Sequence, residues 1–315
     1  MAVKQTYLDH IAHNRRVSVL LMFFMTALLG VVGAALGAAW EQPWAGVAAA
    51  VVVAGLLLLA SYYAGDSAIL AMSHAREIEK KDHPQLFNVV EELSIAAGLP
   101  MPKVYIIEEP APNAFATGRD PQHASVAITR GLLEKLNREE LQGVMAHEMS
   151  HVRNYDIRYA MLMAVMAGAI VLLCDFFWRM AFYGGLGGRR RSSSGRGGGG
   201  AQAVLVVVAL LFAILAPIVA TLIQLAVSRK REYLADASAV ELTRYPEGLA
   251  SALQKIAGDP TPLHAASRAT QHLFICNPVK KLGDRDSVFS THPPISERIA
   301  RLRALASQSQ PATAG

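Results

Sequence analysis

The sequence predicts a mainly α-helical protein with a small β-sheet and several membrane spans. Two observations support this prediction: long uncharged apolar runs, and polar segments between them that carry helix and strand signals. Of the 315 residues, 52% are hydrophobic and 17% are charged, and the mean hydropathy is +0.28, which is too apolar for an ordinary soluble domain. The net charge of +5 fits basic residues beside anionic headgroups; without a nucleic-acid motif, it does not indicate a nucleic-acid partner.

The first two apolar runs predict a tight transmembrane hairpin. Residues 17–40 and 45–65 are uncharged, and each can cross a hydrocarbon core of about 30 Å as a helix. The first run is longer than the apolar core of a signal peptide, about 7–15 residues, so we favour a retained span. The link between the runs carries no Lys or Arg, whereas basic residues flank the hairpin on both outer sides. This pattern places both ends of the hairpin in the cytoplasm. The basic flanking residues are Lys4, Arg15, Arg16, Arg76, Lys80 and Lys81.

A second pair of apolar runs predicts a second hairpin with conflicting signals. Residues 159–174 are uncharged, Asp175 and Arg179 follow, and residues 201–228 are uncharged again. The Arg/Gly-rich residues 187–200 between them have the composition of a flexible linker. Hairpin topology puts this linker outside, yet short arginine-rich loops normally stay inside. Either the pair spans the membrane because apolar length outweighs loop charge, or it packs without crossing; we favour four spans.

The remaining residues are expected to form one polar domain in two parts, residues 66–157 and 229–306, around a hydrophobic insertion at 158–228. Residues 103–108 and 124–129 are expected strands, and residues 307–315 are an expected disordered tail. The first 65 residues are the N-terminal hairpin. Cys174 and Cys276 have neither a disulfide-framework nor a metal-site spacing, which fits a reducing compartment.

An H-E-x-x-H sequence formed by residues 147–151 indicates a metal site. On a helix, His147 and His151 share one face and can bind the same ion, while Glu148 lies beside it. Asn137 is a good helix N-cap, and Glu140 follows at the spacing of a capping box. Apolar residues at helical spacing then support a helix here rather than a loop. The alternative is a surface helix with two solvated histidines.

Glu232 is the candidate for a third zinc ligand, because catalytic zinc sites combine three protein ligands with one open position. It follows the last apolar run in a helix-compatible segment, and Asp236 lies one turn later on the same face. Asp236 can accept the second ring N–H of a ligand histidine. The alternative is an exposed helix whose acids pair with nearby basic residues. Two histidines and this glutamate together predict a gluzincin-type metalloprotease domain with one Zn²⁺ per chain at the inner face of the bilayer.

Four motifs in this order resemble the HtpX heat-shock membrane proteases and, more distantly, the CAAX prenyl protease class. They are His147 to His151 with Asn154 and Asp156, Glu232 with Tyr233 and Asp236, Pro112 to Gly118, and Thr291 to Pro294 with Arg298. The Arg/Gly-rich segment at 187–200 departs from the family pattern. The resemblance covers most of the chain.

The resemblance implies a multi-pass peptidase of the bacterial inner membrane with a cytoplasmic zinc site and a stress-related role in protein quality control. Its partners would be polypeptides, above all misfolded or damaged membrane proteins, and the lipid bilayer. It further implies that Asn154 and Asp156 support the ligands and that His292 contacts the substrate or the oxyanion; a structural His292 is the alternative. It also implies a substrate cleft lined by Asn113, Ala114, Phe115 and Ala116. The alternative for residues 113–118 is a plain turn between strands, which spacing alone does not exclude.

The mechanism that these residues predict is metal-assisted hydrolysis of the peptide bond. Zinc would polarise the carbonyl and lower the pKa of the attacking water. Glu148 would accept the water proton and pass it to the leaving amine. Three alternatives remain: a non-enzymatic membrane protein with structural zinc, a transporter using Asp175, and a dedicated prenyl-protein processing protease. An intact Glu148 argues against the first, and the long polar segments argue against the second.

Overall fold

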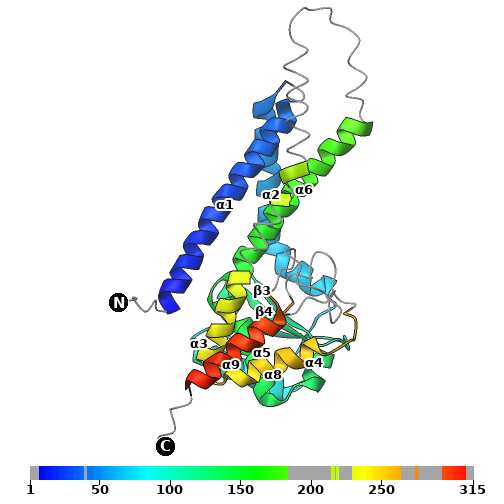
Figure 1. Cartoon of the computed structure of the whole chain (residues 1–315). Helices are drawn as coiled ribbons and strands as arrows, with labels where there is room; N and C mark the ends of the chain where they lie inside the picture. Colours follow the sequence, from blue (N-terminus) through cyan, green and yellow to red (C-terminus); the bar gives the residue numbers. More distant parts are fainter. Residues whose placement is uncertain are drawn as a thin grey trace, which may run out of the picture. The chain divides into compact units, whose positions relative to one another are not determined.

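The computed structural model describes residues 7–38, 41–183, 214–216, 218–219, 229–263, 274–275 and 293–309. The chain divides into two compact units (Figure 1). The sheet unit comprises Met1–Ile11, Tyr63–Ala160 and Leu225–Gly315, and the apolar unit comprises Ala12–Tyr62 and Met161–Gln224. The sheet unit thus collects residues from both sides of the second pair of apolar runs.

The apolar unit contains most of three long helices: α1 (Tyr7–Ala38), α2 (Pro43–Met72) and α6 (Asp156–Tyr183). Helices α1 and α2 approach closely because both carry glycine at their contact. A Cβ atom on Gly46 would lie 2.1 Å from the carbonyl oxygen of Gly33, which no larger residue could tolerate. Buried Met25 and Leu29 of α1 and Ile170 of α6 belong to one apolar cluster, so these helices form a common core.

Two of the described helices are long and apolar enough to cross a membrane, Pro43–Met72 and Asp156–Phe176, and Met22–Ala38 is a shorter apolar helix. The first three expected runs are therefore helical. Helix α2 continues past the predicted end at residue 65 because helical hydrogen bonding does not require apolar side chains. Helix α6 continues through Asp175 and Arg179, which form an ion pair of 2.7 Å. Most of residues 201–228 and the whole linker 187–200 lie outside the described residues.

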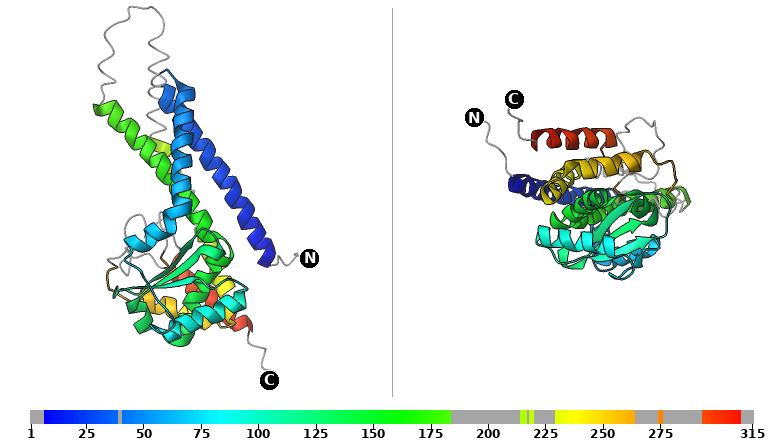
Figure 2. Two further views of the ribbon diagram at one scale, coloured as in Figure 1. Left: turned by 180° about the vertical axis from the view of Figure 1, so that it is seen from behind. Right: turned by 90° about the horizontal axis from the view of Figure 1, so that it is seen from below.

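A four-stranded sheet in the order β1-β2-β4-β3 lies in the sheet unit (Figure 2). Its strands are β1 (Arg76–Glu77), β2 (Lys103–Ile107), β3 (Ala114–Gly118) and β4 (Ala124–Thr129). The two strands predicted from sequence, β2 and β4, are confirmed and pair in parallel. The plain-turn interpretation of residues 113–118 is wrong, because β3 pairs antiparallel with β4 and forms an edge of the sheet.

Helices cover this sheet and contain the remaining core of the unit. They are α3 (Pro84–Ala97), α4 (Arg130–Lys135), α5 (Arg138–Arg153), α8 (Pro246–Ala257) and α9 (Ile295–Ser309), together with a helix over residues 229–243. Helix α5 packs against α3, α8 and β3, and α8 packs against α9, as the right-hand view of Figure 2 shows for α8 and α9. Helix α5 is therefore the central element.

The end of α9 corrects one prediction. Residues 307–309 were expected in a disordered tail, yet they continue the helix. Small polar residues tolerate a helical turn, and the Ser307 hydroxyl donates to the Ala304 carbonyl at 2.8 Å, which satisfies its own polar group within that turn. The disorder prediction is wrong for these three residues; the rest of the tail lies outside the described residues.

Candidate metal centre

Helix α5 begins with the predicted capping box. The Asn137 side chain accepts from the Glu140 N–H, and the Glu140 carboxylate accepts from the Asn137 N–H, both at 2.9 Å. Glu140 also accepts hydrogen bonds from Ser251 and Lys255 of α8, both at 2.6 Å. The start of α5 is thereby tied to α8, which holds the helix in place for His147 and His151, about two to three turns later.

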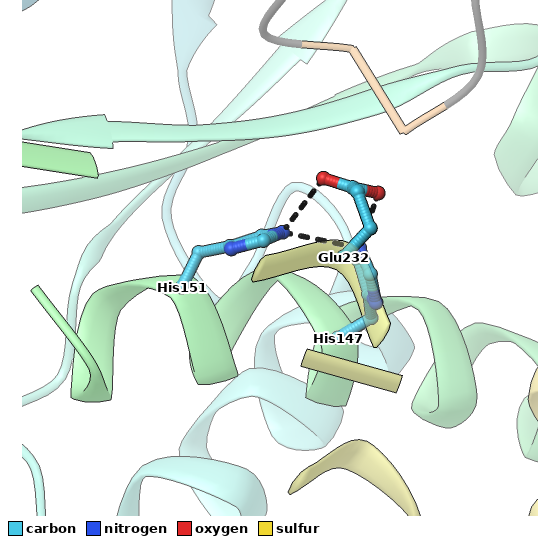
Figure 3. A group of neighbouring side chains, drawn as sticks. All are labelled: His147, His151 and Glu232. Carbon is cyan, nitrogen blue, oxygen red and sulfur yellow. Dashed lines mark hydrogen bonds and ion pairs between the residues drawn. The ribbon is translucent and has the colours of Figure 1, made fainter. Parts of the chain in front are cut away.

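The three predicted ligand side chains converge on one point. His147 and His151 project from α5, and Glu232 reaches them from the helix over 229–243 (Figure 3). One ligand atom from each lies within 4.8 Å of the other two. The two Nε2 atoms are 3.2 Å apart, and the Glu232 carboxylate oxygens lie 3.5 Å from His151 Nε2 and 3.6 Å from His147 Nε2.

These separations fit a tetrahedral zinc ion. Zinc binds histidine nitrogen at about 2.0–2.1 Å, so two nitrogens at tetrahedral angles lie about 3.3 Å apart. The 3.2 Å between the Nε2 atoms agrees with this value. Two imidazoles and one carboxylate are also the donor set of open catalytic zinc sites. Geometry and chemistry together make His147, His151 and Glu232 suitable ligands.

A carboxylate lies behind each imidazole on the side away from the shared point. Asp236 Oδ1 is 2.9 Å from His147 Nδ1, and Asp156 Oδ2 is 3.2 Å from His151 Nδ1. A proton held on each Nδ1 leaves Nε2 with its lone pair for a metal ion. Both aspartates therefore lie where the sequence interpretation needs them.

Arg298 is a site residue whose role the sequence did not reveal. It is fully buried, donates to both oxygens of Asp236 at 2.7 and 2.9 Å, and lies 3.2 Å from Glu232 Oε2. Burial by itself raises the pKa of Asp236, but the charge of Arg298 together with the hydrogen bonds to His147 and Arg298 outweighs burial and holds this pKa below its usual value. The only sequence signal was its position after the His292 motif, which said nothing about its partner.

The surrounding carboxylates raise the pKa of both imidazoles. Burial by itself lowers the pKa of His151, but the hydrogen bonds to Asp156 and Glu232 and the charges of these two carboxylates outweigh burial and raise the pKa to about 10. Burial and the charge of Arg298 lower the pKa of His147. Asp236 and Glu232 outweigh both, so the pKa of His147 is also raised. Since a metal ion binds neutral imidazole, a cation and protons compete for these nitrogens.

Glu148 is buried beside the ligands and is 2% exposed. Its Oε1 atom has no hydrogen-bond partner among the described residues. Burial raises the pKa of this carboxyl group, against the opposing influence of the two imidazoles. A buried carboxylate with an oxygen available and a raised pKa is suited to accept a proton near neutral pH.

The comparisons with known proteins identify the fold that carries this centre. Peptidase family M48 matches residues 80–306 of the chain, which include all three candidate ligands.

The chain belongs to peptidase family M48.

Its relatives match over nearly their whole length. The "Protease HtpX homolog" of Listeria monocytogenes is 49% identical over 300 residues, which are 93% of this chain and 98% of the relative. The protein of the same description from Dictyoglomus thermophilum is 45% identical and covers 95% of each chain. The resemblance inferred from the motifs is confirmed, and this M48 peptidase is a metalloendopeptidase. The non-enzymatic alternative is therefore wrong.

One solved structure shares the fold. The crystal structure of S. mikatae Ste24p has a TM-score of 0.52 and 17% sequence identity, and the match covers 94% of this chain and 67% of that one. At this identity the similarity concerns the fold alone. It supports the arrangement of helices around a small sheet.

The predicted substrate residues of the M48 peptidase lie on the edge strand β3 or directly before it. Asn113 precedes β3, and its main chain is held by Thr129, which accepts from the Asn113 N–H at 2.8 Å. The Ala114 carbonyl accepts from the Ile275 N–H at 2.9 Å, and Phe274 packs edge-on against Phe115 with ring centroids 5.1 Å apart. Residues 274–275 thus lie along the start of β3.

The structure leaves the roles of two further predicted residues untested. Asn154 lies at the C-cap of α5, where its N–H donates to the Ser150 carbonyl at 2.9 Å; its supporting role stays a prediction. His292 lies outside the described residues, so its contact with substrate or oxyanion also stays a prediction.

Proposed function

We propose that this M48 peptidase is a membrane-embedded zinc endopeptidase that cleaves misfolded or damaged membrane proteins at the cytoplasmic face of the bacterial inner membrane. The observation that supports it most directly is the convergence of His147, His151 and Glu232, with buried Glu148 beside them. A structural zinc site would need no base next to its ligands, whereas a hydrolytic site does.

In the proposed mechanism, His147, His151 and Glu232 would hold a zinc ion, which would supply Lewis-acid chemistry for the scissile carbonyl and the attacking water. Glu148 accepts the proton of that water and passes it to the leaving amine. Asp236 and Asp156 keep the Nδ1 protons in place and so orient the two imidazoles. The main-chain groups of Asn113 and Ala114 are already bonded within the protein, so among the candidate substrate residues from Asn113 to Ala116 an extended peptide would bind the sheet edge by main-chain hydrogen bonds at Ala116.

The catalytic part of the proposal is tested by the change Glu148→Gln. This variant keeps the three ligands, so we expect zinc binding to persist while cleavage of an unfolded test protein falls by about 10²–10⁴-fold. Purification in detergent with a chelator, followed by zinc addition, measures metal content and proteolysis on the same sample.

The matched control is Glu139→Gln, which removes an exposed carboxylate from the same helix and should leave cleavage unchanged. Proteolysis that persists in the Glu148→Gln variant, or cleavage without zinc in the wild type, contradicts the mechanism.

The membrane topology is supported by the two apolar helices and by the basic residues on the outer sides of the hairpin. In a background without Cys174 and Cys276, single cysteines can replace the exposed residues Gln42 and Gln85. An impermeant maleimide added to intact spheroplasts should label position 42 in the hairpin link and spare position 85 in α3. Labelling at position 85 rules out the cytoplasmic orientation.

The substrate class needs its own test in proteoliposomes that contain the peptidase and a second membrane protein. We expect cleavage of that protein after thermal damage and little cleavage of its native form. Equal cleavage of both forms contradicts the quality-control proposal without affecting the zinc mechanism.

A further inference from the structure

Arg231, the residue before Glu232, is a buried cation that the hydrolytic scheme does not use. It is 5% exposed. Its Nη1 donates to the Asp156 carbonyl oxygen at 3.2 Å, and its Nε lies 3.4 Å from Asp156 Oδ1. Its guanidinium carbon is 5.1 Å from the ring centroid of Tyr159. Burying a guanidinium is costly unless charge and hydrogen-bond partners compensate it, and here both come from the first turn of α6.

The same aspartate supports a candidate ligand through its other oxygen. Asp156 Oδ2 is 3.2 Å from His151 Nδ1, so Arg231, Asp156 and His151 form a continuous chain of contacts. The planar guanidinium has several donors in a fixed arrangement and can therefore fix the position of a carboxylate better than an ammonium group can. With Oδ1 and the main chain near Arg231, Oδ2 is directed at the imidazole.

We propose that Arg231 is a positioning residue of the metal centre: it holds Asp156 against His151 and joins the first turn of α6 to the helix that carries Glu232. The inference depends on the proposed zinc site. Arg231 and Asp156 are 75 positions apart, on either side of the second pair of apolar runs. The contact between Arg231 and Asp156 thus links the first turn of α6, which supports His151, to the helix that supplies Glu232.

A purely structural Arg231 would stabilise the fold without changing the affinity of the centre for zinc. The two roles differ in a double-mutant cycle, because a residue that acts through Asp156 loses its effect once that carboxylate is altered. The variants are Arg231→Gln, Asp156→Asn and the double variant, with zinc affinity measured by chelator competition and Co²⁺ absorption reporting ligand geometry.

We expect Arg231→Gln and Asp156→Asn each to weaken zinc binding by about tenfold, the lower end for residues that orient metal ligands. The double variant should be no weaker than the worse single variant, and the Co²⁺ spectrum should change in all three. Arg231→Lys keeps the positive charge but loses the planar set of N–H donors, so it should retain part of the zinc affinity that Arg231→Gln loses. It also provides a measurable variant if Arg231→Gln does not fold.

The matched control is Arg303→Gln, which removes an exposed ion pair to Glu247 and should leave zinc affinity and the spectrum unchanged. Wild-type affinity in the folded Arg231 variants, or additive losses in the double variant, overturns the inference while the zinc site stands. A wild-type protein that binds no zinc overturns the proposed function itself, so the two failures are distinguishable.

Discussion

The two halves of the metal centre are assembled in different ways. On the His151 side, the supporting Asp156 follows only five residues later in the chain, and the His151 side chain is 15% exposed. On the His147 side, Asp236 and Arg298 come from distant helices, and the His147 side chain is 1% exposed. The first half contains a local pair with one distant contact from Arg231, whereas both supporting residues of the second half come from elements distant in the chain. The second half should therefore be more sensitive to mutation.

The largest expected effect tests the distant half through Arg298→Met. Removing this guanidinium leaves the carboxylates of Asp236 and Glu232 buried without their neighbouring cation. We expect a loss of about 3–5 kcal/mol in the free energy of unfolding, as for other buried ion pairs that lose one partner. Denaturant unfolding of the purified protein in detergent measures it.

Arg303→Met on the same helix is the control, because its ion pair is exposed and should contribute at most about 1 kcal/mol. Similar stabilities for the two variants would show that the His147 side does not depend on α9.

A direct comparison of the halves uses Asp236→Asn and Asp156→Asn. Loss of either carboxylate should weaken zinc binding by about 10–100-fold. For Asp236→Asn we expect a loss of zinc affinity near the upper end of this range. The contact of Asp236 with His147 is shorter than that of Asp156 with His151, and Arg298 donates to both oxygens of Asp236. Asp156→Asn should lie near the lower end. Chelator competition gives both affinities, and the reverse order contradicts the proposed difference between the halves.

The last expected effect is a pH dependence of zinc binding that both halves share. Since the pKa of His151 is raised to about 10 and that of His147 is also raised, zinc must displace protons at neutral pH. Raising the pH removes this competition, so zinc should bind more tightly from pH 6.5 to pH 8.5. The expected gain is about tenfold per pH unit for each displaced proton.

Calorimetry in buffers of different ionisation enthalpy counts the released protons. Binding that is independent of pH and releases no proton would contradict the raised pKa values. Asp156→Asn should lower the pKa of His151 and so reduce the number of protons that this residue releases when zinc binds. The effect of His151 is thereby separated from that of His147.

Several features of the fold followed from local sequence signals. The Asn137 capping box started α5 as predicted, and β2 and β4 lie where their apolar residues indicated. Other features depended on neighbours: spacing alone left a plain turn open for residues 113–118, whereas β3 forms there by pairing with β4. Apolar run length predicted where a span could lie, yet it did not predict the continuation of α2 to Met72.

The sequence by itself determined that His147, Glu148 and His151 lie together, because a helix places residues four apart on one face whatever surrounds it. It also identified Glu232 and Asp236 as candidates through their spacing and their place after an apolar run. Only the tertiary structure decided that Arg298 holds Asp236 and that Arg231 holds Asp156. Contacts between residues far apart in the chain depend on how helices pack, and no local periodicity encodes that packing.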